Sequence, residues 1–359
     1  MSLKKLMNKI FYPKPEKVLG IDIDVDQIKI VQLDMKRNST PEVTDYVLMD
    51  LPENLRNNGF LEYPEELETF LGEIINKHGF SAKDCAFSLG GRSAFVRGIT
   101  MPPMSTEEMR QAVLWDSAQY VPYEADTYYV DHATYGSLDG EGQQPIVIVA
   151  APKNIVDTLI ATADKLALKV FKVDINVLAL DRLMGGDVAD FIMLDLDRNY
   201  SLMTIFQKGA PVAQRSIPGG AMSFAQIIAD KLNMSISNAM DVMRGEQLLA
   251  SEAPENQVVR AGLQVEVDNI VKECRRTAEY FILNKKDAAF SSLILCGPGA
   301  MLPGLEGSMN EQMDIKVKLF QVLEKIHFDS RFEKKKVEQN APSLAVAIGV
   351  ALAGGEVHD

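Results

Sequence analysis

The sequence of 359 residues has no apolar run of the ~18 to 20 residues that a membrane-spanning helix needs. Its first residues also lack the apolar core and the small-residue cleavage site of a secretory signal peptide. With 47% hydrophobic residues the chain can bury a large core, and its length suggests two domains or one two-lobed unit. We therefore expect a globular protein that stays in the cytoplasm.

Cysteine and histidine are scarce, which excludes several kinds of site. The three cysteines, Cys85, Cys274 and Cys296, are odd in number and far apart, so the sequence has neither a disulfide framework nor a CxxC metal site. We expect all three to be small core residues. The four histidines show no HExxH-type spacing. Metal-dependent hydrolysis and histidine-based catalytic triads therefore find no support.

Basic charge is also in short supply, because 37 Lys and Arg face 50 Asp and Glu and the net charge is −13. The basic stripe that binds nucleic acid is missing, so no nucleic-acid partner is expected. One short basic segment, 1–17, has apolar residues at helical spacing and then Pro13 and Pro15. At ~1 kcal/mol per lysine, this arm could bind an anionic membrane surface only weakly and peripherally. The alternatives are a disordered tail and a helix packed on its own domain.

What the sequence does contain is a pair of similar hairpins. The stretch 18–33, VLGIDIDVDQIKIVQL, has two short apolar runs on either side of an acidic turn at 24–26, which predicts a β-hairpin. The stretch 191–206, FIMLDLDRNYSLMTIF, repeats the pattern, with Asp195 where the first stretch has Asp22. Two such hairpins, about 170 residues apart, predict a two-lobed fold with internal duplication.

The pattern between the hairpins predicts an inserted subdomain. Residues 84–168 predict strand, helix, strand, strand and helix, in which 86–89 and 95–101 form a pair of strands. Ser105 and Glu108 form a capping box at the start of the helix. The predicted organisation is an arm at 1–17, a first lobe of 18–83 with 169–190 and 335–355, the subdomain at 84–168, and a second lobe at 191–334. The closing small-residue helix is expected to pack closely between the lobes.

Together these segments resemble the PilM family of type IV pilus assembly proteins, actin-like relatives of the cell-division protein FtsA. The residues that carry the resemblance are LGIDI (19–23), SAFVRGITMPPMSTEEMRQAV with YVPYE (93–124), LDL with SIPGGAMSF (194–224), ILCGPGAMLPGLEGSM (294–309) and APSLAVAIGVAL (341–352). The match covers nearly the whole chain. The MPPMSTEEM block is its most specific part, because it belongs to the subdomain that sets PilM and FtsA apart from actin.

The resemblance implies an α/β, two-lobed actin-like ATPase fold with an inserted strand-helix-strand-strand-helix subdomain of the SHS2 type found in FtsA. It also implies a cytoplasmic protein at the inner face of the cytoplasmic membrane. Such a protein binds the N-terminal tail of a PilN-like membrane protein and meets other proteins of the pilus assembly platform. A division role like that of FtsA is less favoured, because FtsA carries its membrane helix at the C-terminus and this chain ends in AGGEVHD.

Through the family, the partner site is expected in the groove between the first lobe and the inserted subdomain. A short, apolar, extended tail needs an apolar floor and backbone donors at a strand edge or helix end. The candidate contacts in the subdomain are Phe95, Arg97, Trp115, Tyr120 and Pro122. For Val96, Met109 and Val113 of the same subdomain, a place in the core is the stronger expectation.

The two hairpin turns depart from the family where the phosphates of a nucleotide would bind. Such families place glycine two residues after the strand aspartate, as in GIDIG, because only a turn without a side chain lets backbone N–H groups approach phosphate. This chain has Asp24 and Asp197 there, and Asp26 in place of a small hydroxyl residue. A carboxylate ~4 Å from a phosphate costs roughly 4 kcal/mol at an effective dielectric of ~20, whereas one N–H bond to an anion returns ~1.5 to 3 kcal/mol. Repulsion therefore exceeds attraction unless a cation intervenes.

Other nucleotide contacts implied by the resemblance are also changed. Met240 and Met243 stand where the helix that holds ribose and adenine carries Glu and Lys. The candidate cofactor-binding residues are Asp22, Asp24, Asp26, Asp195, Asp197, Gly219, Gly220, Gly297 and Gly299, with Asp22 and Asp195 as metal ligands only if a magnesium-nucleotide binds.

Two functions from different classes stay open. The first is a scaffold that holds a partner peptide and has no tightly bound cofactor. The second is a slow ATPase or nucleotide switch that binds ATP and Mg²⁺, in which Asp24 and Asp26 help to hold the metal. The altered turns favour the scaffold over the enzyme.

Overall fold

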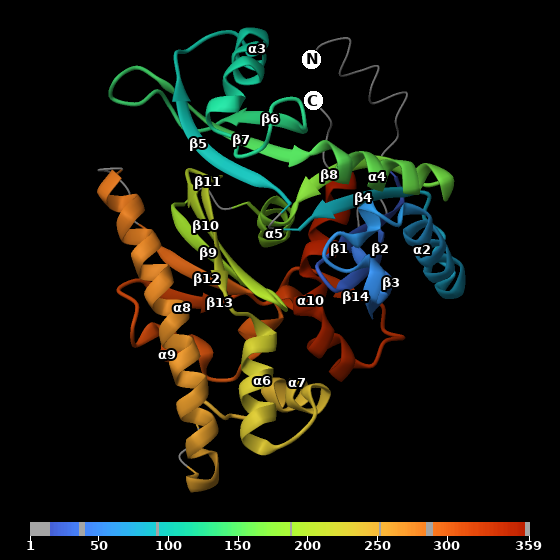
Figure 1. The fold of residues 1–359 in the computed structure, drawn as a ribbon, viewed down its shortest axis with the longest axis vertical. Helices are drawn as coiled ribbons and strands as arrows, with labels where there is room; N and C mark the ends of the chain where they lie inside the picture. Colours follow the sequence, from blue (N-terminus) through green and yellow to red (C-terminus); the bar gives the residue numbers. More distant parts are fainter. Residues whose placement is uncertain are drawn as a thin grey trace.

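The computed structural model describes residues 15–35, 40–90, 93–186, 189–250, 253–284 and 290–355. The predicted arm at 1–17 therefore lies outside the described residues, except for its last three. Figure 1 shows two lobes side by side and a further unit above them. Among the described helices, none is long and apolar enough to cross a membrane.

The first lobe is built on a six-stranded sheet with the order β14-β3-β2-β1-β4-β8. Its strands are β1 (Lys17–Ile23), β2 (Gln27–Asp34), β3 (Glu42–Asp50), β4 (Asp84–Leu89), β8 (Lys169–Ile175) and β14 (His327–Phe328). β1 and β2 form an antiparallel hairpin that is buried along almost its whole length, which confirms the first predicted hairpin. The sheet is mixed, because β4 pairs in parallel with both β1 and β8.

The second sheet has eight strands in the order β13-β12-β9-β10-β11-β5-β7-β6. They are β5 (Phe95–Met101), β6 (Tyr128–Thr134), β7 (Gln144–Pro152), β9 (Phe191–Leu196), β10 (Tyr200–Gln207), β11 (Ala210–Pro218), β12 (Ser292–Cys296) and β13 (Lys316–Leu319). β9 and β10 form the second predicted hairpin. β11 and β5 share the single pair Ala213 and Arg97, so the strands of the inserted unit continue the sheet of the second lobe.

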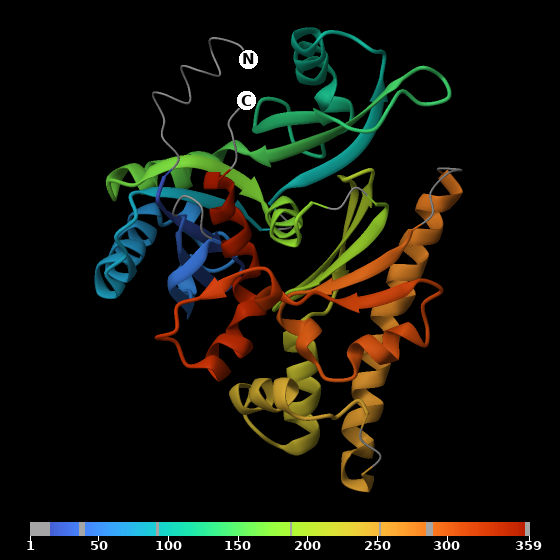
Figure 2. The ribbon, with the colours of Figure 1, turned by 180° about the vertical axis from the view of Figure 1, so that it is seen from behind.

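Helices lie on both sides of the sheets (Figure 2). In the first lobe they are α2 (Pro64–His78), α4 (Lys153–Lys165), α5 (Asn176–Met184) and α10 (Lys334–Leu352). In the second lobe they are α6 (Ala221–Leu232), α7 (Ile236–Gly245), α8 (Gln257–Asn284) and α9 (Leu305–Asn310). The inserted unit contributes α3 (Thr106–Asp116), which begins at the predicted capping box. There the Ser105 hydroxyl accepts the N–H of Glu108, and the Glu108 carboxylate accepts the N–H of Ser105.

The predicted pairing of 86–89 with 95–101 is wrong. β4 pairs with β1 and β8 in the first sheet, whereas β5 pairs with β7 and β11 in the second. β4 is buried at nearly every position, which is typical of a strand covered on both faces in a parallel arrangement. The short segment after Leu89 therefore carries the chain from one sheet to the other.

This pairing shifts two predicted boundaries. Residues 84–89, assigned to the inserted subdomain, belong to the first sheet, so the strand-helix-strand-strand part of the inserted unit is β5, α3, β6 and β7. At the other end, β14 pairs with β3, so the chain returns to the first lobe at about residue 327 and not at 335. α4, the predicted closing helix of the unit, follows β7 in the chain and packs on α2 and β8 of the first lobe.

Small residues let α10 approach its neighbours closely. A Cβ atom at Gly20 in β1 would lie 1.9 Å from the carbonyl oxygen of Ala347, and one at Gly349 would lie 2.0 Å from the carbonyl oxygen of Ala179 in α5. α10 packs mainly on β1, β2 and α5, so the expected close packing occurs chiefly within the first lobe and not between the lobes.

Replacing Gly20 by alanine is expected to lower the free energy of unfolding by about 1 to 3 kcal/mol, because the new methyl group meets the backbone of a buried helix. Urea unfolding followed by circular dichroism measures the change. Gly140→Ala is the matched control, since nothing lies within 4 Å of a Cβ atom there. Equal loss of stability in both variants would contradict this account of the packing.

Candidate functional site

The turns of the two hairpins meet between the lobes and bring five charged side chains together. We call Asp22, Asp24, Lys29, Asp195 and Asp197 the aspartate cluster. All five are buried. The antiparallel register places Asp22 of β1 directly opposite Lys29 of β2, so both side chains point to the same face of the sheet.

Lys29 is the only basic residue of the cluster, and its ammonium group contacts carboxylates of both lobes. Its Nζ atom lies 3.1 Å from Oδ2 of Asp22, 3.3 Å from Oδ2 of Asp24 and 3.7 Å from Oδ1 of Asp197. Sequence reasoning missed this lysine. The predicted hairpin contained the signal for it, because pairing across the turn places residue 29 opposite residue 22.

In each turn an aspartate side chain also accepts a backbone N–H of the same turn. Oδ1 of Asp24 accepts the N–H of Val25 at 2.8 Å, and Oδ1 of Asp197 accepts the N–H of Arg198 at 2.7 Å. These amides follow the positions where glycine was expected, and they are the groups that a phosphate would use in such a turn. In this chain each of these amides donates to a carboxyl oxygen of the preceding aspartate.

A second set of contacts joins the turns nearer the surface. Nε of Arg198 donates to Oδ2 of Asp26 at 2.9 Å, and Nδ2 of Asn199 donates to Oδ1 of Asp26 at 2.8 Å. The Tyr200 hydroxyl donates to Oδ1 of Asp24 at 3.4 Å. Asp26 thus contacts the opposite lobe.

The electrostatics follow from four buried carboxyl groups that share one ammonium group. Burial raises the pKa of Asp195 to about 7, although Lys29 lowers it. Burial also raises the pKa of Asp22, and burial together with the charge of Asp24 raises that of Asp197. Burial acts in the same direction on Asp24, but Lys29 and a hydrogen bond from Asp197 outweigh it and lower its pKa. The pKa is therefore raised in three of the four carboxyl groups and lowered in Asp24.

The cluster does not fit the magnesium ion that an actin-like fold implies. Oδ1 of Asp22 is buried without a hydrogen-bond partner, but the Lys29 ammonium beside this carboxyl group would repel a divalent cation. Across the described ranges, no group of three or more His, Cys, Asp or Glu side chains is arranged to hold a metal ion.

Close packing around the candidate cofactor-binding glycines explains why glycine stands at these positions, without reference to a ligand. A Cβ atom at Gly297, whose φ is +81°, would lie 2.4 Å from Oδ1 of Asp195. A Cβ atom at Gly220 would lie 2.4 Å from the carbonyl oxygen of Asp197, and one at Gly299 would lie 3.0 Å from the backbone oxygen of Leu196. Gly219, with φ +90°, is packed against Glu266. These glycines let the turns after β11 and β12 approach the end of β9.

The two methionines of α7 are core residues. Met240 and Met243 are buried in the large hydrophobic cluster of the two lobes. They stand where the resemblance places ribose and adenine contacts, but in the structure both side chains are buried and pack in the core.

The predicted partner residues are spread over the inserted unit. Phe95 and Tyr120 are partly buried and pack on the core of that unit, and the guanidinium of exposed Arg97 lies 5.9 Å from the centre of the Tyr120 ring. Trp115, on α3, is 82% exposed. Pro122 is exposed as well. The structure therefore brings Phe95, Arg97 and Tyr120 together in the inserted unit, and Trp115 and Pro122 lie exposed on it.

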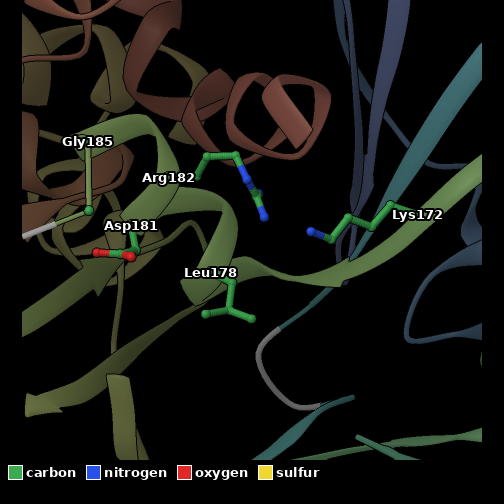
Figure 3. Close-up of a pocket in the computed structure, with 6 residues that line it drawn as sticks. Lys172, Leu178, Asp181, Arg182 and Gly185 are labelled. Carbon is green, nitrogen blue, oxygen red and sulfur yellow. The ribbon is translucent and has the colours of Figure 1, made fainter. Parts of the chain in front are cut away.

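An open pocket of about 420 Å³ lies beside β8 and α5 (Figure 3), a place that sequence reasoning did not single out. The residues that line it are Lys172, Leu178, Asp181, Arg182, Gly185 and Gly186. Lys172 and Arg182 both contact Oδ2 of Asp174, at 3.8 Å and 2.7 Å. Figures 1 and 2 draw β8 and α5 between the rest of the first lobe and the inserted unit.

Comparison with known proteins agrees with this architecture. The family model described as type IV pilus assembly protein PilM matches residues 20–354. A chain of the structure described as the PilM-PilN type IV pilus biogenesis complex superposes with a TM-score of 0.76 and 23% identity, over 96% of this chain and 100% of that chain. No curated protein matches the sequence.

More distant structures share the fold. The ethanolamine utilization protein EutJ from Carboxydothermus hydrogenoformans superposes with a TM-score of 0.53 and 13% identity, over 94% of this chain and 90% of that chain. MreB5 of Spiroplasma citri bound to AMPPNP gives a TM-score of 0.53 and 10% identity, over 95% of this chain and 96% of that chain. The fold is therefore the actin-like ATPase fold that the sequence predicted.

The raised pKa of Asp195 makes stability depend on pH. Between the unfolded pKa of 3.8 and the folded value of about 7, the folded state holds a proton that the unfolded state has lost, so the free energy of unfolding falls as pH rises through this window. Asp195→Asn removes this term. From pH 5 to pH 7 the variant should lose about 2 kcal/mol less than the parent protein in urea unfolding. Equal slopes against pH would show that Asp195 is ionised in the folded protein.

Proposed function

The chain belongs to the PilM family of type IV pilus assembly proteins, and from this premise we propose that it is an actin-like adaptor of a pilus assembly platform. In this proposal it works at the inner face of the cytoplasmic membrane. There it binds the N-terminal cytoplasmic tail of a PilN-like membrane protein and meets other platform proteins. The PilM-PilN complex among the similar structures supports a PilN-like partner.

The edge of β8 is the observation that supports our placement of the tail. In the part of the chain that the structure describes, β8 ends the first sheet and pairs with β4 alone. An extended peptide can add to such an edge by backbone hydrogen bonds, while neighbouring pockets receive its side chains. Because the pocket opens beside β8, edge and pocket together form a receptor for a short extended segment.

The lining of the pocket indicates what kind of segment it accepts. Leu178 offers an apolar surface, and Lys172 and Arg182 bring two cationic groups to the same side (Figure 3). Arg182 also donates to the carbonyl oxygen of Gly349 at 3.0 Å, so its guanidinium is held in position. An apolar side chain with a carbonyl or carboxylate oxygen next to it would complement this lining.

The inserted unit would supply the opposite wall. Arg97 and Tyr120 remain our proposed contacts there, because the guanidinium is exposed and lies over the aromatic ring. Phe95 would act indirectly, through its packing on the core of the unit. Trp115 and Pro122 are also exposed, and substituting them would test whether the contact surface is wider.

Truncating the pocket should weaken binding of a synthetic PilN-like tail. Lys172→Ala and Leu178→Ala are each expected to cost about 1 to 3 kcal/mol of binding free energy, because each removes one anchor of a small interface. Isothermal titration calorimetry measures the change. Lys169→Ala is the matched control, since Lys169 is an exposed lysine at the other end of the same strand and does not line the pocket.

The inserted unit is tested in the same titrations. Tyr120→Ala should weaken binding by about 1 to 3 kcal/mol if the tail also contacts the opposite wall. Loss of affinity in Tyr120→Ala and Trp115→Ala, with both pocket variants unaffected, would move the site from β8 to the surface of the inserted unit. Absence of any binding by the parent protein would refute the adaptor proposal itself.

In this proposal the chain is a scaffold without a tightly bound nucleotide. The support is that Lys29 and the amides of Val25 and Arg198 already have carboxylate partners. A phosphate entering between the two hairpin turns would have to displace those carboxylates or stand beside them, and charge repulsion opposes both. The competing proposal, a slow ATPase or switch with ATP and Mg²⁺, requires the cluster to reorganise around the ion.

Mg·ATP should therefore bind to the parent protein with a dissociation constant weaker than about 100 μM. The loss of glycine contacts and one added charge cost more than ~4 kcal/mol, or about a thousandfold in affinity. Calorimetric titration with ATP and Mg²⁺ measures the constant. A value in the low micromolar range would favour the nucleotide switch.

A further inference from the structure

The aspartates of the two turns have the chemistry of a bound phosphate. Asp24 and Asp197 each present a carboxyl oxygen to a turn amide, at 2.8 Å and 2.7 Å. Both also contact the ammonium group of Lys29. Backbone amides at a turn and a lysine are the donors with which proteins commonly hold phosphates. The same donors here hold side chains of the chain itself.

The contacts of these groups also cross between the lobes. Lys29 belongs to the first hairpin and contacts Asp197 of the second. Arg198 and Asn199 of the second hairpin contact Asp26 of the first. Tyr200 adds a bond to Asp24. A ligand between the lobes is therefore not needed to connect them.

We propose that Asp24 and Asp197 are built-in phosphate surrogates, which occupy the amides and the lysine that a nucleotide would use and so hold the lobes closed without a ligand. This inference goes beyond the binding of a partner tail and does not depend on it. A metal ligand would help to bind the nucleotide. Asp24 and Asp197 instead take the place of the nucleotide.

Burial strengthens this connection. The side chains of Lys29, Asp24 and Asp197 are at most 6% exposed, so dissolved salt screens their attraction poorly. The outer pair is more accessible, with Arg198 and Asp26 about one-fifth exposed. The inner contacts are therefore expected to keep the lobes together at high ionic strength.

The test replaces both surrogates by the glycine that a phosphate-binding turn would have. Asp24→Gly with Asp197→Gly frees the two amides and leaves Lys29 available for phosphate. Mg·ATP should then bind at least about tenfold more tightly than to the parent protein. Hydrogen exchange at the two turns should be fast without ATP and slow with it. Asp314→Gly is the matched control, because its side chain is 89% exposed and lies outside the cleft.

A second measurement keeps the test decisive if the double variant does not fold. Arg198→Ala removes the outer contact but leaves both surrogates in place, so exchange at both turns should rise without any gain in affinity for ATP. In the parent protein, exchange at the turns should be the same with and without saturating Mg·ATP. The inference is overturned if Mg·ATP slows exchange in the parent protein, or if Arg198→Ala, which keeps both surrogates, binds Mg·ATP about tenfold more tightly than the parent protein.

The outcome is separable from that of the adaptor proposal. Binding of the PilN-like tail is measured on the same preparations of parent protein and Asp314→Gly. A tail that fails to bind, together with turns that behave as described, would refute only the adaptor. A tail that binds, together with turns that close on adding Mg·ATP, would refute only the phosphate surrogates.

Discussion

The ammonium group of Lys29 is the interaction on which the meeting of the two lobes depends. It lies among carboxylates that come from both hairpins, and none of these groups reaches bulk water. Removing one partner from such a buried ionic set typically costs about 3 to 5 kcal/mol, because the charge left behind is unpaired. The raised pKa values of Asp195 and Asp197 follow from burial beside other carboxyl groups, with one lysine to offset them.

This constraint explains why recognition is proposed at the surface of the first lobe and not in the cleft. The two hairpin turns contact each other through side chains of the chain itself, while β8 keeps an open edge beside a pocket. The first hairpin and the pocket beside β8 belong to the same lobe. Arg182 of the pocket donates to Gly349 of α10, and α10 packs closely on β1, which carries Asp22.

Local features could be predicted from the sequence, and long-range pairings could not. The hairpins and the capping box depend on residues close in the chain, and the three cysteines are buried as expected. The partner of β4 was missed because a continuous apolar run does not specify which strand lies beside it. Lys29 could have been found from the hairpin register, whereas the contacts of Arg198 with Asp26 and the pocket at β8 require the tertiary fold.

In our interpretation the lobes are held closed by the charges of the chain itself. It is tested most directly by the distance between the lobes in solution. Spin labels on Glu73→Cys in α2 and Lys272→Cys in α8 would report it by pulsed electron resonance, because both positions are exposed and the native cysteines are buried. We expect one narrow distance distribution that is identical with and without Mg·ATP. A broad or double distribution that becomes narrow when Mg·ATP is added would contradict it.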